Sequence, residues 1–150
     1  MKKMGIEGVG PKIAIYAIIY LVLAYIFDRS YHASFLITDN SGSLNWLMII
    51  LFIIGLILWI SSAVMMVVYF PKGKLITSGP FRIFLNPLYN AFILFLLPAL
   101  ALYLNSWIFF GASIVFILAE KILGKAEEKF LQETFGKEYE DYRQKVWFKI

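Results

Sequence analysis

The chain has no cysteine, a single histidine and few charged residues. Without cysteine it can form no disulfide, thiolate nucleophile or cysteine-based metal site. The one histidine, His32, is expected in a loop, so no metal centre is predicted. Asp, Glu, Lys and Arg make up 16% of the 150 residues, whereas 61% are hydrophobic. A soluble core of this size cannot bury such long uncharged segments, so the sequence predicts an integral membrane protein.

Four apolar segments predict a single all-α membrane domain over residues 1–150, with no repeat. We expect spans at about 11–27, 44–70, 88–104 and 106–120, since a span needs about 20 apolar residues. The first segment lacks a small-residue cleavage signal and is expected to be retained. Helices are predicted at about 121–135 and 138–147, packed on the cytoplasmic side under the last hairpin. The fourth span can continue directly into the first of them.

Basic residues alternate along the loops. Those before the first span and after the second are Lys2, Lys3, Lys12, Lys72, Lys74 and Arg82. The other two loops carry no basic excess. Because basic loops stay in the cytoplasm, both termini and both flanks of the last hairpin are predicted to be cytoplasmic. The net charge is +4, but the basic residues lie at membrane boundaries rather than in one stripe. The expected partner is therefore the bilayer and not a nucleic acid.

Two polar blocks bracket the last hairpin. The first block, residues 77–89, reads Thr-Ser-Gly-Pro-Phe-Arg and continues to Asn-Pro-Leu-Tyr. The second block, residues 126–143, contains Glu127-Glu128 and then Phe-Gly-Lys-Glu-Tyr-Glu-Asp-Tyr-Arg. A hairpin that crosses the bilayer and returns places both blocks on one membrane face. There they could build one site.

The first block has features of an anion site. Gly79-Pro80 fixes a turn, and Asn86-Pro87 places an N-cap and an N1 proline at the start of the third span. Free N–H groups at that helix start, with Arg82 nearby, would attract a carboxylate. The alternative interpretation is that Arg82, Lys72 and Lys74 only anchor the membrane edge and Asn86 only caps the helix.

The second block supplies carboxylates. Glu127 and Glu128 could accept hydrogen bonds from the hydroxyl or ammonium groups of a ligand. Tyr139 and Tyr142, with Tyr89 of the first block, could present aromatic faces to a cationic ligand. Alternatively, the glutamates lie on a solvated helix face and the tyrosines belong to an interfacial aromatic belt.

Together, the order and spacing of the blocks resemble the isoprenylcysteine carboxyl methyltransferase and phospholipid methyltransferase superfamily of integral membrane enzymes. The resemblance covers residues 75–146. That family commonly has Arg-His-Pro or Arg-Asn-Pro followed by X-Tyr before the hairpin, and an acidic pair with Phe-Gly-X-X-Tyr-X-X-Tyr after it. Leu85 stands where the family usually has arginine. The end after Val146 lacks the usual arginine and proline.

The resemblance implies an S-adenosylmethionine-dependent enzyme that methylates a lipidic or prenylated acceptor, on a carboxylate oxygen or an amine nitrogen. The site would face the cytoplasm. It implies catalytic roles for Arg82, Asn86 and Glu128. The cofactor-binding residues implied are Gly79, Pro80, Phe81, Arg82, Asn86, Pro87, Tyr89, Glu127, Glu128, Tyr139 and Tyr142.

Two other functions are compatible with the sequence. A sterol-type membrane reductase with a nicotinamide cofactor has a similar C-terminal region, but such enzymes generally have more spans. A non-catalytic relative could have kept the fold. The shortness of the chain and the Gly-Pro-Phe-Arg segment favour the methyltransferase. The acceptor and the oligomeric state stay open, since Gly55 and residues 61–63 suit packing within the chain or between two copies.

Overall fold

The computed structural model describes residues 9–149; Lys2 and Lys3, which contribute to the predicted orientation, lie outside this range. The described residues form an all-α fold, as predicted. Its principal helices are α1 (Gly10–Phe35), α2 (Asn45–Tyr69), α3 (Pro87–Ala91), α4 (Leu97–Tyr103), α5 (Gly111–Leu123), α6 (Lys125–Phe135) and α7 (Lys137–Lys145). A π-helical turn, Phe92–Leu96, joins α3 to α4.

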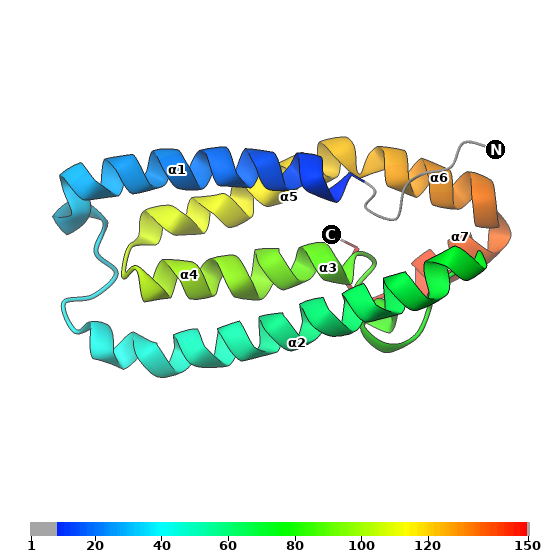
Figure 1. Cartoon of the computed structure of the whole chain (residues 1–150), viewed down its shortest axis with the longest axis horizontal. Helices are drawn as coiled ribbons and strands as arrows, with labels where there is room; N and C mark the ends of the chain where they lie inside the picture. Colours follow the sequence, from blue (N-terminus) through cyan, green and yellow to red (C-terminus); the bar gives the residue numbers. More distant parts are fainter. Residues whose placement is uncertain (1–8, 150) are drawn as a thin grey trace.

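The helices lie side by side, with the hairpin of α3, α4 and α5 between the two long helices (Figure 1). α1 packs along α5, and α2 packs along α3 and α4. The amphipathic helices α6 and α7 follow at one end of this bundle. The hairpin is therefore supported on both sides, and its open end lies beside the C-terminal helices.

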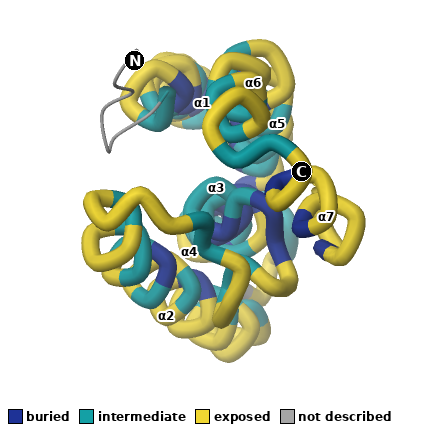
Figure 2. Tube along the Cα trace, turned by 90° about the vertical axis from the view of Figure 1, so that its right-hand side faces the viewer, coloured by how far each residue is buried: buried dark blue, intermediate teal, exposed yellow. Residues whose placement is uncertain are grey.

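Two helical segments, Gly10–Phe35 and Gly42–Lys72, are long and apolar enough to cross a membrane. A third candidate consists of Trp107–Leu123 and Lys125–Phe135 if this bent pair counts as one span. Pro87–Tyr103 is a shorter apolar helix. Many large apolar residues of α1 and α2 are exposed, as expected of surfaces in lipid, and Figure 2 colours much of both helices as exposed. The protein is thus an all-α membrane protein with two to three candidate spans.

Small residues let the helices approach closely in the middle of the bundle. Ala17 of α1 and Ala112 of α5 are both buried in one apolar cluster. A Cβ atom on Gly55 of α2 would lie 2.8 Å from the Cβ atom of Phe95 and 2.9 Å from side-chain atoms of Leu96. Gly55 therefore serves packing within the chain, in the manner of small residues at membrane helix interfaces.

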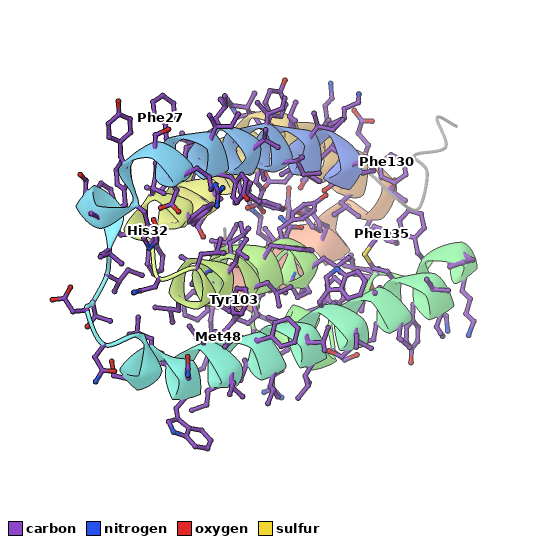
Figure 3. All side chains as sticks on the ribbon, turned by 60° about the vertical axis from the view of Figure 1, so that its left-hand side comes forward. Phe27, His32, Met48, Tyr103, Phe130 and Phe135 are labelled. Atoms are coloured by element: carbon purple, nitrogen blue, oxygen red, sulfur yellow. The ribbon has the colours of Figure 1, made fainter. Side chains whose placement is uncertain are left out.

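The expectation that His32 lies in a loop was wrong. Helix α1 continues to Phe35, with non-helical backbone angles at Tyr31, and His32 lies in its last turn. The His32 Nδ1 atom is 3.0 Å from an Asp28 carboxylate oxygen, one helical turn earlier. Figure 3 shows His32 at the end of the bundle opposite Phe130 and Phe135.

Two helices depart from regular geometry. Pro98 lies in the first turn of α4, directly after the π-helical turn. Because proline has no N–H to donate and crowds the preceding turn, a local change of helix type accommodates it. The helix after the hairpin is not continuous either: α5 and α6 are bent by 44° at Gly124. The bend directs α6 over the end of the bundle.

Candidate functional site

The two polar blocks meet at one end of the bundle. The Tyr89 hydroxyl of α3 donates to Glu127 of α6, with distances of 3.0 and 3.1 Å to the two carboxylate oxygens. The Tyr142 hydroxyl of α7 donates to the carbonyl oxygen of Phe81 at 2.7 Å. The segments before and after the hairpin thus form one region, as the hairpin argument predicted.

The C-terminal segment is held against the first block. The Leu85 N–H donates to the Phe148 carbonyl at 2.9 Å, and the Phe148 N–H donates to the Ile83 carbonyl at 2.9 Å. Leu85 is 5% exposed and packs in an apolar cluster with Tyr139, Tyr142 and Val146. A leucine at position 85 therefore joins the start of the hairpin to α7 through apolar contact.

A cavity of about 210 Å³ lies where the blocks meet. Its walls are mainly apolar and come from the end of α2, the loop before α3, and the helices α6 and α7. Its polar groups include Asn86, Tyr89, Glu127 and Tyr139. Tyr139 is 1% exposed, and its hydroxyl has no hydrogen-bond partner within residues 9–149. Such a buried hydroxyl is a candidate to bind a ligand.

Glu127 links three helices at this larger cavity. Its Oε1 atom accepts a hydrogen bond of 2.7 Å from the Val9 N–H, at the start of α1, and another from Tyr89 of α3. Burial raises the pKa of Glu127, while the hydrogen bonds from Val9 and Tyr89 partly offset that rise. Glu127 is therefore a half-buried carboxylate that is hydrogen-bonded within the protein, rather than part of a solvated helix face.

Asn86 occupies the N-cap position and Pro87 the first helical position, as the sequence predicted. The Asn86 side chain, however, makes no capping hydrogen bond. Its Nδ2 atom donates instead to Glu120 Oε1 at 3.0 Å, which connects the start of α3 to the end of α5. An interpretation of Asn86 as a cap alone is therefore wrong.

Glu120 is a site residue that the sequence analysis missed. It lies in the last turns of α5 and is 5% exposed. In the sequence it resembles one of the charged residues that commonly end a membrane span. The spacing gives one available signal: on a continuous helix, Glu120 would lie about two turns before Glu127 and near the same helix face.

A second cavity, of about 160 Å³, lies on the other side of Asn86. Unlike the larger one, it is lined mostly by charged residues, among them Glu120 and Glu128. Glu128 also forms an ion pair of 3.3 Å with Arg143 of α7. Asn86 lines both cavities and thus lies at their junction.

The other predicted site residues fall into two groups. Phe81, Pro87 and Tyr142 line the larger cavity with Tyr89, Glu127 and Tyr139. Gly79, Pro80 and Arg82 line neither of the two cavities, and Arg82 is exposed. Gly79 has a φ of +59°, and a Cβ atom there would lie 3.0 Å from the Met65 sulfur. Glycine at position 79 therefore permits both the turn and the close approach to α2.

The fold thus defines an all-α membrane protein with two adjoining cavities at one end of its bundle. Comparison with known proteins gives the family. The family model described as phospholipid methyltransferase matches residues 44–138. The chain belongs to the phospholipid methyltransferase family.

Two rice proteins are among its curated relatives, one from Oryza sativa subsp. indica and one from subsp. japonica. Each is named "Probable protein-S-isoprenylcysteine O-methyltransferase". Each is 34% identical to the chain over 88 residues, which is 52% of this chain and 41% of the relative. The match thus spans less than half of those relatives. No solved structure matches the chain.

Proposed function

We propose that the protein is a membrane-embedded methyltransferase that uses S-adenosylmethionine and methylates a lipidic or prenylated acceptor. Membership of the phospholipid methyltransferase family supports methyl transfer. The outward-facing apolar side chains of α1 and α2 support an acceptor that arrives through the bilayer. The observation that carries the proposal is the joining of the two polar blocks around the larger cavity, through Tyr89 and Glu127.

The residues at this cavity fit the donor's chemistry. Glu127 can accept hydrogen bonds from ribose hydroxyls or an ammonium group. The Tyr139 hydroxyl, without a partner in the described part of the chain, can bind a further polar group. Rings such as those of Phe81 and Phe130 can contact an adenine base. When bound, S-adenosylmethionine supplies a methyl group on a sulfonium, already an effective donor.

The protein then has mainly to orient the reactants and exclude water. Orientation can supply about 7–11 kcal/mol of barrier reduction in favourable cases. We assign this role to Asn86, at the junction of the two cavities, and to Glu127 and Glu128 on either side of it. Gly79 and Pro80 shape the loop. Arg82 stays a prediction for the group that holds the donor's carboxylate.

We also propose four spans, with both termini and the site on the cytoplasmic face. The third and fourth spans would be the arms of the hairpin, residues 87–103 and 107–123. The loop at the site end carries Lys72, Lys74 and Arg82 without an acidic residue, which supports a cytoplasmic location. No observation favours the nicotinamide-dependent reductase, so it is not proposed.

Equilibrium binding to the detergent-purified chain tests this function. Micromolar binding of S-adenosylmethionine, without comparable binding of NADPH, is expected. Labelled S-adenosylmethionine incubated with the protein and a pooled membrane lipid extract should then transfer label to a lipid, and mass analysis of that lipid identifies the acceptor. A folded protein that binds neither cofactor would contradict an enzymatic role.

A further inference from the structure

Near the end of α5 lies a carboxylate of which only one oxygen atom has a hydrogen-bond partner among the described residues. Glu120 is 5% exposed, and its Oε1 atom accepts the hydrogen bond from Asn86. Its Oε2 atom is buried and has no hydrogen-bond partner among residues 9–149. A buried polar atom without a hydrogen bond destabilises the folded state, and more so when it carries charge. Such an atom calls for a physical explanation.

A purely structural role does not explain a carboxylate here. Tethering Asn86 requires one acceptor oxygen, which the uncharged amide of glutamine would supply equally well. The second oxygen and the negative charge are needed only if a donor of positive charge approaches. The part of the chain described here places no hydrogen-bond donor on Oε2. A ligand cation would satisfy both requirements.

The second cavity shows what kind of ligand could bring that cation. Glu120 and Glu128 line it together with three lysines, Lys121, Lys125 and Lys149. Gly124 also lines it and adds no side chain. Two acidic and three basic residues thus line one space of about 160 Å³. This arrangement complements a small group that carries a positive and a negative charge.

We propose that this second cavity binds a zwitterionic group, with its ammonium at Glu120 and Glu128 and its anion at the three lysines. Two ligands carry such a group: the aminocarboxylate end of the methyl donor and the headgroup of an amine-bearing phospholipid. The choice of these two sources rests on the proposed function. The charge pattern of the cavity does not depend on it.

Matched pairs of probes that differ in the ammonium group test the proposal on the full chain in uncharged detergent. The first pair is S-adenosylhomocysteine and its deamino analogue. The second pair is dihexanoylphosphatidylethanolamine and dihexanoylphosphatidylethanol. The wild-type protein should bind the ammonium-bearing member of at least one pair about tenfold more tightly, the effect of a charge-assisted hydrogen bond. The pair that shows the preference identifies the source.

Variants then assign the preference to Glu120. Glu120→Gln should reduce the tenfold preference to less than twofold and leave binding of the partner that lacks the ammonium group unchanged. Glu133→Gln, an identical change on the exposed face of α6, should keep the full preference. If Glu120→Gln does not fold, Glu128→Gln serves as the second variant and should also reduce the preference.

The absence of a preference in both wild-type pairs would overturn the proposal, as would a preference that survives these substitutions at the second cavity. Failure of the proposed function is distinguishable from these results. A wild-type protein that methylates lipids but shows no preference contradicts only the zwitterion site. A folded wild-type protein that binds neither adenosyl probe contradicts the methyltransferase, while the phospholipid pair still tests the second cavity.

Discussion

The middle of the bundle and its site end are both well packed, but different forces hold them. In the middle, small residues such as Ala17, Gly55 and Ala112 let apolar helices touch. At the site end, hydrogen bonds and the cluster around Leu85 join the loop to α7. Lipid tails are as apolar as the helices, so burial from lipid supplies no hydrophobic driving force, and close contact alone remains.

In the proposed topology the site end lies outside the bilayer, where burial of apolar area is itself stabilising, by about 25 cal/mol per Å². This difference explains how the chain can combine a simple apolar bundle with a polar site. The bundle positions the hairpin, and the C-terminal helices close over its end. The stability of the two regions can therefore be altered separately.

The largest difference in stability between the two regions is expected when a buried leucine is replaced by alanine. Leu85, at the site end, is 5% exposed, and Leu97, in the middle, is 7% exposed. Leu85→Ala should lower the free energy of unfolding by about 3 kcal/mol, because the variant loses both the free energy of burying leucine away from water and its packing contacts. Leu97→Ala should cost about half as much, since only packing is lost in lipid. Reversible unfolding in mixed micelles measures both; equal costs would contradict the comparison.

A smaller effect is expected from overpacking the middle. Gly55→Val should destabilise the protein by about 2 kcal/mol, because new methyl groups would meet Phe95 and Leu96. Ile57→Val on the outer surface of α2, where Ile57 is 63% exposed, is the control and should change little. Unfolding in the same micelles measures both variants. A Gly55→Val protein as stable as wild type would mean that α2 does not pack closely against the hairpin.

Removal of one hydrogen bond at the site end should have a still smaller effect. Tyr142→Phe deletes the donor to the Phe81 carbonyl and should cost about 1 kcal/mol. Tyr103→Phe, at a 70% exposed position, provides the matched control and should be neutral. Chemical unfolding followed by tryptophan fluorescence reports both. Identical midpoints would indicate that this bond does not hold α7 to the loop.

The smallest effect concerns pH. Because the pKa of Glu127 is raised in the folded protein, folding favours its protonated form. The corresponding stability is present below the ordinary carboxyl pKa and is lost as pH rises through the raised folded value. Glu127→Gln removes this pH dependence. The free energy of unfolding of the wild type minus that of the variant should therefore fall as pH rises across that window. A difference that does not vary with pH would contradict a buried carboxylate at position 127.

The sequence predicted the broad architecture because apolar length and loop charge are local signals. It also predicted that residues 77–89 and 126–143 meet, since a hairpin returns the chain to its starting face. It did not predict the 44° bend at Gly124, which depends on how α6 packs. Nor did it predict the Asn86–Glu120 hydrogen bond, because local spacing does not determine contacts between residues 34 positions apart.

The most direct test of the central claim, that the two polar blocks form one methyl-donor site, is a double-mutant cycle on S-adenosylmethionine affinity. The cycle combines Tyr89→Phe with Glu127→Gln, whose wild-type side chains are hydrogen-bonded. Glu133→Gln on the exposed face is the control. We predict about tenfold weaker binding for Glu127→Gln and little further loss in the double variant, since coupled residues are not additive. Wild-type affinity in all variants, or fully additive losses, would contradict a single site.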